Sequence, residues 1–217
     1  MPTATTKKAK KASPTKTVAS SAKSDQKRDE IVRAATEIIN NKSYAEATLV
    51  DIAAALSLRD ATLYHYFPDK RALAYACHLN SLQRFEQLLQ TTADGGGCGA
   101  HKLRSFIRNM LDDSAENGPL LYFGDYSYLH APQRKAISQW AQRLMAILES
   151  LLQEGMDDGS IKQCEPELVV NLLVGMIVWF SKWVPGIANL TVDRLMNAID
   201  VFTFKGLDQT PAPRAKK

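Results

Sequence analysis

The chain has 217 residues, of which 45% are hydrophobic, and this is enough to build a buried core and excludes a wholly disordered protein. The net charge of +4 is uneven: residues 1–28 carry +7 and residues 29–213 carry −6, so the basic arm either meets an anionic surface such as phosphate or is a solvated leader. The three scattered cysteines argue against a disulfide framework. No run of about 18 uncharged apolar residues is present to span a membrane, and no apolar leader indicates a signal peptide. These features indicate a soluble, cytoplasmic protein.

The N-terminal arm and the first helix differ in composition. Residues 1–24 consist mainly of Lys, Ala, Ser, Thr and Pro, and so few large apolar side chains cannot offset the entropy of ordering. We therefore expect this arm to be disordered. From Asp25 onward, apolar residues recur at helical spacing and predict an amphipathic helix to about Asn41, with Ser24 or Asp25 as its cap.

Two short helices are expected next. Thr48 and Asp51 fit the spacing of a capping box, with Asp in place of Glu, and they mark the start of the second helix. A turn through Ser57-Leu58 leads to a third helix over residues 59–66. Pro68 ends that helix, because proline lacks an amide proton and disfavours helix in the residue before it.

A long fourth helix is expected to run from Lys70 to about Thr92, capped by Asp69. Residues 94–99 contain four glycines and predict a linker. A phosphate-cradling loop is the weaker interpretation, because no strand precedes the glycines and no Gly-Lys-Ser/Thr follows them. No segment alternates polar and apolar residues, so the predicted fold class is all-α. Further helices are expected at residues 101–116, 120–129, 133–157, 166–184 and 192–204.

Short helices joined by tight turns behind a basic arm suggest a helix-turn-helix. Residues 28–73 read RDEIVRAATEIINNKSYAEATLVDIAAALSLRDATLYHYFPDKRAL, and this string resembles the TetR family of bacterial repressors. The most specific stretch is TLYHYFPDK at residues 62–70, followed by Ala72 and Leu73. The resemblance implies an N-terminal three-helix DNA-binding domain and a C-terminal helical domain for ligand binding and dimerisation.

The sequence departs from the family pattern at four positions. Ser43 and Ser57 stand where the family usually has glycine, and Ala61 stands where glycine is frequent. Arg59 replaces the usual Ser or Thr and cannot cap the recognition helix as a hydroxyl would. These changes bear on the preferred DNA sequence rather than on the fold.

A recognition helix places its N-terminal residues in the major groove. Arg59 is suited either to a bidentate contact with guanine or to a phosphate contact. Ala61 either lies against a thymine methyl group or only allows close approach of the backbone. Thr62 has a hydroxyl suited to a phosphate or a base edge. The resemblance implies that Tyr64 and His65 touch DNA, the tyrosine most often through a phosphate.

Two more phosphate contacts are expected outside the recognition helix. Thr48 can offer its hydroxyl and a helix N-terminus. Lys70 resembles the phosphate-contacting lysine of the family, and its alternative is a solvated charge. Tyr66 and Phe67 are expected in the core, because aromatic residues at helical spacing usually bury themselves. The histidines lack ligand spacing, so no metal site is expected.

The C-terminal half is expected to bind a ligand and a second copy of the chain. Residues 168–180 are apolar almost all round, and such a helix must be buried on most of its surface. With the helix after it, which has an apolar stripe from Leu195 to Phe202, it predicts a four-helix dimer interface, or else an internal core. Aromatic residues that could line an apolar pocket, or simply belong to the core, are Tyr122, Phe123, Tyr126, Trp140, Trp179 and Trp183.

The predicted domains are a disordered arm (1–24), a DNA-binding domain (25–74), a ligand-binding and dimerisation domain (75–206) and a disordered tail (207–217). The expected function is that of a transcriptional regulator, a repressor that a small apolar or acyl-CoA-like effector releases from a palindromic operator. Double-stranded DNA, a second copy and that effector are the expected partners, with no membrane and no cofactor. An architectural protein that binds DNA through its arm is an alternative. A thioester-processing enzyme is another, although no GxSxG motif, paired motif carboxylates or phosphate loop is present.

Overall fold

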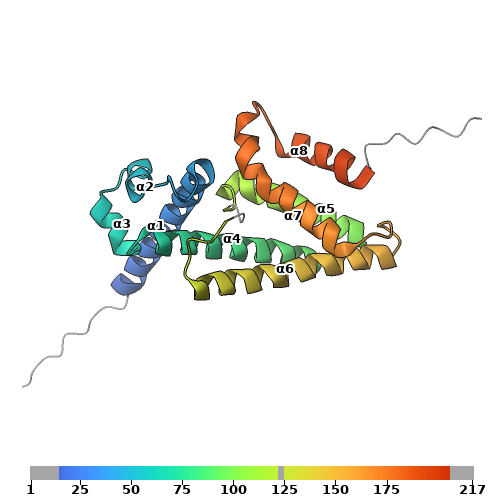
Figure 1. Ribbon diagram of the computed structural model, residues 1–217, viewed down its shortest axis with the longest axis horizontal. Coiled ribbons are helices and arrows are strands. Elements are labelled where there is room, and N and C mark those ends of the chain that lie inside the picture. The colour runs from blue at the N-terminus through green and yellow to red at the C-terminus, as the bar shows by residue number, and fades with distance from the viewer. Residues whose placement is uncertain (1–14, 122–124, 206–217) are drawn as a thin grey trace, which may run out of the picture.

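The computed structural model describes residues 15–121 and 125–205, and within these ranges the fold is all-α, as predicted, with no strand. Helices α1–α3 form a small head, α5–α8 form a larger body, and α4 joins the two (Figure 1). The elements are α1 (Thr15–Lys42), α2 (Leu49–Ala55), α3 (Asp60–Tyr66), α4 (Lys70–Ala93), α5 (Gly99–Asn117), α6 (Ala131–Asp157), α7 (Pro166–Trp183), the 3₁₀ turn η1 (Val184–Gly186), α8 (Val192–Ile199) and the π-helical turn η2 (Asp200–Lys205).

Local capping signals determine where the helices of the head begin. Thr48 and Asp51 form the predicted capping box at the start of α2, with both reciprocal hydrogen bonds present. Asp69 caps α4 by accepting a hydrogen bond of 2.7 Å from the Ala72 amide. Arg59 precedes α3 and makes no capping hydrogen bond, as its side-chain type indicates. These helices begin and end within about one residue of the positions predicted from the sequence.

Helix α1 begins earlier than predicted. It starts at Thr15, so the predicted disorder is wrong for residues 15–24, and Ser24 and Asp25 lie inside the helix instead of capping it. The physical reason is that extending an existing helix avoids the unfavourable nucleation of a new one, and the stretch contains neither Gly nor Pro to stop it. The first fourteen residues of the arm and the predicted tail at residues 207–217 lie outside the described residues.

The helix predicted at residues 120–129 is wrong in its described parts, since residues 118–121 and 125–130 are not helical. Gly118 has a φ of 81°, which stops α5, and Pro119 follows it. The last predicted helix is also shorter than expected, because α8 ends at Ile199 and the chain continues as the π-helical turn η2.

Two hydrophobic cores share helix α4. The head core contains Leu73 and Cys77 of α4, packed with Ile31, Ile52 and Leu63 of the three head helices. The body core contains the next turns of α4, where Phe85 packs edge-on against Phe106 of α5 at 5.1 Å between ring centroids. Because one continuous helix lies in both cores, the head is held at a defined angle to the body.

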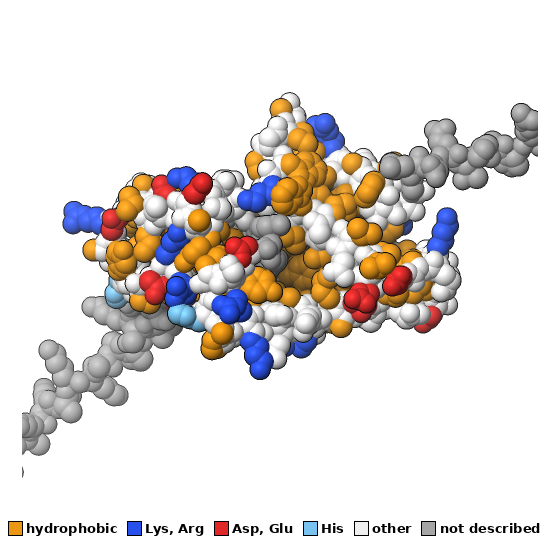
Figure 2. Space-filling view, in the orientation of Figure 1, with side chains coloured by type: hydrophobic (Ala, Val, Ile, Leu, Met, Phe, Trp, Pro, Cys, Tyr) orange, Lys and Arg blue, Asp and Glu red, His pale blue; other side chains and the backbone are white. Residues whose placement is uncertain are grey.

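Helix α7 is apolar on two faces, and only one of them is buried. Val170, Leu173 and Ile177 lie in the body core, whereas Leu172 is 74% exposed and Trp179 is 50% exposed. Apolar side chains are visible over this side of the body (Figure 2). By length and composition alone, residues 166–186 could cross a membrane. From the sequence, the apolar run at residues 168–179 looked too short to span a bilayer. In the structure, only 22% of the most apolar window is buried. The same features fit a helix that packs against another protein surface.

Two serines adopt the left-handed backbone conformation that favours glycine. Ser43 has a φ of 83° and Ser57 a φ of 53°, both at positions where the resembled family usually has glycine. Ser57 follows the end of α2, where its amide donates to Ala54 and the Leu58 amide donates to Ala53 at 2.8 Å. This pair of hydrogen bonds is the Schellman motif, which requires a left-handed residue at position 57. The turn of the helix-turn-helix is therefore strained by a side chain.

Replacing Ser57 with glycine should relieve this strain. We expect Ser57→Gly to raise the free energy of unfolding by about 0.5–1 kcal/mol, because the left-handed penalty of an L-residue exceeds the extra entropy of glycine in the unfolded chain. Urea unfolding followed by circular dichroism measures the change. Ser57→Ala is the matched control, since it keeps the Cβ atom. Equal stability of the Gly and Ala variants would show that the turn is not strained.

Candidate DNA interface and ligand cavity

Helix α3 has one face in the head core and one face in solvent. Leu63 and Phe67 are buried and fasten the helix and its C-terminal end to the head. Among the predicted DNA-binding residues on or beside α3, Tyr64 is 54% exposed. Arg59, Ala61 and His65 are also exposed, and Thr62 is half-buried. The structure thus brings these five side chains to the outer part of the head, where they are accessible to a duplex.

Helix α2 contributes one exposed apolar residue that was not predicted. Val50 is 60% exposed, next to the capped start of α2. The sequence predicts no role for Val50. Unlike Leu49 and Ile52, Val50 does not pack in the head core. An apolar side chain beside a recognition helix is suited to contact with a thymine methyl group or a sugar.

The hydroxyl of Thr48 is already used within the head. It accepts a hydrogen bond of 3.0 Å from the Asp51 amide and donates one of 2.8 Å to the Asp51 carboxylate. Lys42 adds an ion pair of 2.9 Å to the same carboxylate. The hydrogen bonds from Lys42 and Thr48 lower the pKa of Asp51 to about 2. The capping box therefore stays charged and closed at neutral pH.

Lys70 is also held within the head. Its Nζ donates to the Ala45 carbonyl at 3.2 Å and lies 4.4 Å from the centre of the Tyr44 ring. Tyr44 in turn stacks on Tyr128 of the body, with 3.5 Å between ring centroids. A phosphate contact by Lys70 would have to share its ammonium group with these partners.

His78 lies where the head and the body meet. Its side chain is fully buried, and its Nε2 is 2.9 Å from the hydroxyl oxygen of Tyr128. Burial lowers the pKa of His78 to about 4, because a charged imidazole would be poorly solvated there. The same burial raises the pKa of Tyr128. Both side chains are therefore neutral at pH 7.

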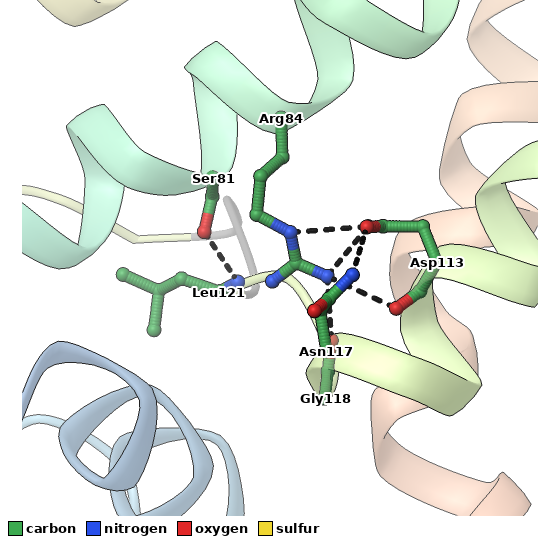
Figure 3. Close-up of polar contacts among 6 residues, drawn as sticks. All are labelled: Ser81, Arg84, Asp113, Asn117, Gly118 and Leu121. Carbon is green, nitrogen blue, oxygen red and sulfur yellow. Dashed lines mark hydrogen bonds and ion pairs between the residues drawn. The ribbon is translucent and has the colours of Figure 1, made fainter. Parts of the chain in front are cut away.

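The segment from Gly118 to Leu121 is fastened on several sides (Figure 3). Arg84 of α4 pairs with Asp113 of α5 and donates to the Gly118 carbonyl at 2.8 Å. The Leu121 amide donates to Ser81 of α4 at 2.9 Å. The side chain of Leu121 is 1% exposed and belongs to the head core, although it follows α5 of the body. This segment, the wedge, therefore lies between the two cores, with Leu120 in the body core and Leu121 in the head core.

A cavity of about 290 Å³ lies in the body beside this segment. Helices α5, α7 and α8 line it together with Pro119, Leu120 and η1. Three of its lining side chains are polar, each through a hydroxyl, and no lining residue carries a charge. The hydroxyls belong to Ser114, Ser181 and Thr191.

The aromatic pocket predicted from the sequence does not coincide with this cavity. Tyr122 and Phe123 lie outside the described residues. Tyr126 and Trp140 pack half-buried against the body core, and Trp179 and Trp183 are exposed on α7; none of these four lines the cavity. From α7 the cavity instead takes Ile177, Val178, Phe180 and Ser181. Among the described residues, no group of three or more His, Cys, Asp or Glu could hold a metal ion.

Comparison with known proteins relates both parts of the chain to one family. Residues 31–77 match the family described as "Bacterial regulatory proteins, tetR family", and residues 96–203 match "Tetracyclin repressor-like, C-terminal domain". The HTH-type transcriptional regulator BetI of Stenotrophomonas maltophilia (strain R551-3) is 31% identical over 93 residues, which cover 42% of this chain and 47% of BetI. The match thus spans about half the length of that curated relative.

Solved structures share the fold. PfmR, a TetR family transcriptional regulator from Thermus thermophilus, is 21% identical with a TM-score of 0.70, and the match covers 82% of this chain and 99% of PfmR. AibR, solved in complex with isovaleryl coenzyme A and operator DNA, is 21% identical with a TM-score of 0.66, over 79% of this chain and 95% of AibR. At this identity the likeness establishes the architecture alone.

The buried histidine predicts how stability depends on pH. Since the folded pKa of His78 is about 4 and the unfolded value is about 6.5, the unfolded chain takes up the proton first as the pH falls. The stability contributed by neutral His78 is complete above about pH 6.5 and is lost towards pH 4, so about 2 kcal/mol should disappear between pH 7 and pH 5. Urea unfolding at both values should show a correspondingly smaller loss for His78→Gln. The exposed His101→Gln is the control, and parallel pH profiles for all three proteins would contradict the assignment.

Proposed function

Because the chain belongs to the TetR family of bacterial regulatory proteins, we propose that it is a homodimeric, sequence-specific repressor that a small effector releases from a palindromic operator. Regulators of this family bind DNA, act as dimers and are generally not enzymes. The observation that carries the proposal is the exposed face of α3, which presents Arg59, Tyr64 and His65 while Leu63 and Phe67 hold the helix to the head.

The proposed roles on α3 follow from side-chain chemistry. Arg59 reads guanine or binds a phosphate, and Ala61 packs against a thymine methyl group. Thr62 and Tyr64 donate hydroxyl hydrogen bonds to phosphates, which fix the position of the head on the duplex. His65 lies beside them on the exposed face. Thr48 and Lys70 are secondary contacts in this proposal, since both already have partners within the head.

The exposed face of α7 supports the proposed homodimer. Leu172, Trp179 and Phe202 are each at least half exposed, which leaves a large apolar area in water. Gly175 lies on the same helix with no atom near its hypothetical Cβ, so a second backbone can approach closely there. A two-fold pairing of α7 and the α8 region would bury these side chains against their own copies.

The proposed release is a shift between two arrangements of the dimer. Two recognition helices must lie roughly 34–36 Å apart to enter successive major grooves. An effector that binds more tightly to a different arrangement lowers DNA affinity by the ratio of its two affinities. The cavity beside α7 is the proposed effector site, because it is apolar with a few hydroxyls, as small-molecule sites usually are.

Selection of genomic fragments tests the proposed DNA function. Purified protein near 0.15 M salt should enrich fragments that share one palindrome, and Tyr64→Ala should weaken binding to that palindrome at least tenfold. His65→Ala should also weaken it, while His101→Ala, an exposed histidine of the body, should not. Uniform recovery of fragments would favour nonspecific binding through the basic arm. Unchanged affinity in both Tyr64→Ala and Lys70→Ala would show that the head reads DNA in another way.

The homodimer has a separate test. Leu172→Glu would place two carboxylates in the proposed apolar interface, so we expect the dimer dissociation constant to rise at least a hundredfold. Sedimentation equilibrium measures it. Gln142→Glu adds the same charge on the exposed side of α6 and should leave the dimer unchanged. A dimer that resists Leu172→Glu would place the interface elsewhere.

A further inference from the structure

The cavity of the body has a chemistry that selects among effectors. Its lining is aliphatic and aromatic apart from the hydroxyls of Ser114, Ser181 and Thr191. A buried anion needs cationic or several polar partners to offset its lost hydration, and no lining residue supplies a charge. Hydroxyls can instead satisfy one neutral polar group. At about 290 Å³, the space is at the lower limit of ordinary small-molecule sites.

Two walls of this cavity also hold the end of helix α1. The Leu120 carbonyl accepts a hydrogen bond of 2.8 Å from Asn40 Nδ2, and Leu120 lines the cavity. Lys182 follows the lining residue Ser181 on α7, and its Nζ donates to the Asn40 carbonyl. Asn40 is 2% exposed and lies in the last turns of α1, the first helix of the head.

The hydrogen bonds of Asn40 make the head sensitive to both walls. A buried amide that loses its partner costs about 1–3 kcal/mol, so Asn40 follows Leu120 when that carbonyl moves. Leu121, the next residue, lies in the head core and moves with the same segment. A ligand that pushes Pro119-Leu120 away from α7 therefore displaces the end of α1 or breaks one of these hydrogen bonds.

We propose, building on the ligand-responsive function above, that the cavity takes a small uncharged apolar molecule and that Asn40 carries its occupancy to the DNA-binding head. The ligand packs against the apolar faces of α5 and α7 and gives its one polar group to a hydroxyl. The relay consists of Leu120 and Lys182 on the body side and Asn40 on the head side. No residue of this lining would offset the charge of an acyl-coenzyme A phosphate placed inside the cavity.

A matched pair of fluorescent probes tests the ligand class. N-phenyl-1-naphthylamine is uncharged, and 8-anilino-1-naphthalenesulfonate has the same ring skeleton with a sulfonate. We expect the uncharged probe to bind at least tenfold more tightly, and isovaleryl-coenzyme A not to displace it. Ser114→Lys, which places a cation in the lining, should reverse the preference, whereas His101→Lys on the exposed side of α5 should not. Equal binding of the two probes, displacement by the thioester, or no effect of Ser114→Lys would overturn the assignment.

Hydrogen exchange tests the relay without DNA. Adding N-phenyl-1-naphthylamine to the wild-type protein should change the amide exchange of residues 31–42 at least twofold. Asn40→Leu and Lys182→Met should bind the probe as before but lose this change, while Lys162→Met, an exposed lysine of the α6–α7 connection, should keep it. If Asn40→Leu, which replaces a buried residue, unfolds the protein, Lys182→Met alone tests the relay. No change in the wild type, or a change that persists in Lys182→Met, would overturn the relay. Because no operator is involved, these results are independent of whether the protein recognises a palindrome.

Discussion

The burial of helix α4 in two separate cores is the constraint on which the rest of the structure depends. Leu73 and Cys77 lie in the head core, and Leu89 lies in the body core at the other end of the helix. His78 occupies the join between the two parts and is fully buried. A packed interior resists gradual deformation, and a change in the body must therefore move α4 and the head together or not at all.

The wedge from Gly118 to Leu121 adds a second connection between the two parts. Without it, the head would be attached through α4 and the contacts near its axis. Leu121 packs in the head core, and the Leu120 carbonyl accepts a hydrogen bond from Asn40. The body therefore also contacts the head at the end of α1. The ion pair of Arg84 with Asp113 stabilises this contact, because the same guanidinium donates a hydrogen bond to the Gly118 carbonyl. Two separated attachments define an angle, and the angle of each head sets the spacing of recognition helices in the proposed dimer.

Helices α2, α3 and α4 could be predicted from the sequence to within about a residue, because their signals are local, whereas the start of α1 was predicted ten residues too late. Thr48 with Asp51, and Asp69 before α4, mark helix starts by hydrogen bonds to amides three residues away. The helix predicted at residues 120–129 was wrong because the apolar residues of this segment pack in different cores. Leu121 lies in the head core and Leu129 lies in the body core. Periodicity cannot reveal that division. The cavity was missed for a related reason, since on a helix as apolar as α7 the sequence does not show that Trp179 faces solvent and Phe180 the interior.

Helix α7 combines the two demands that a ligand-controlled dimer makes. One face lines the cavity through Ile177 and Phe180, and the other leaves Leu172 and Trp179 in solvent, available to a second copy. Any ligand that shifts α7 thus acts on the proposed dimer contact as well as on Asn40 through Lys182. A hundredfold loss of DNA affinity requires a difference of only about 2.7 kcal/mol between the two arrangements. Burial of a few more apolar carbon atoms in one arrangement than in the other contributes that much, so an uncharged ligand can supply the difference without any charged contact.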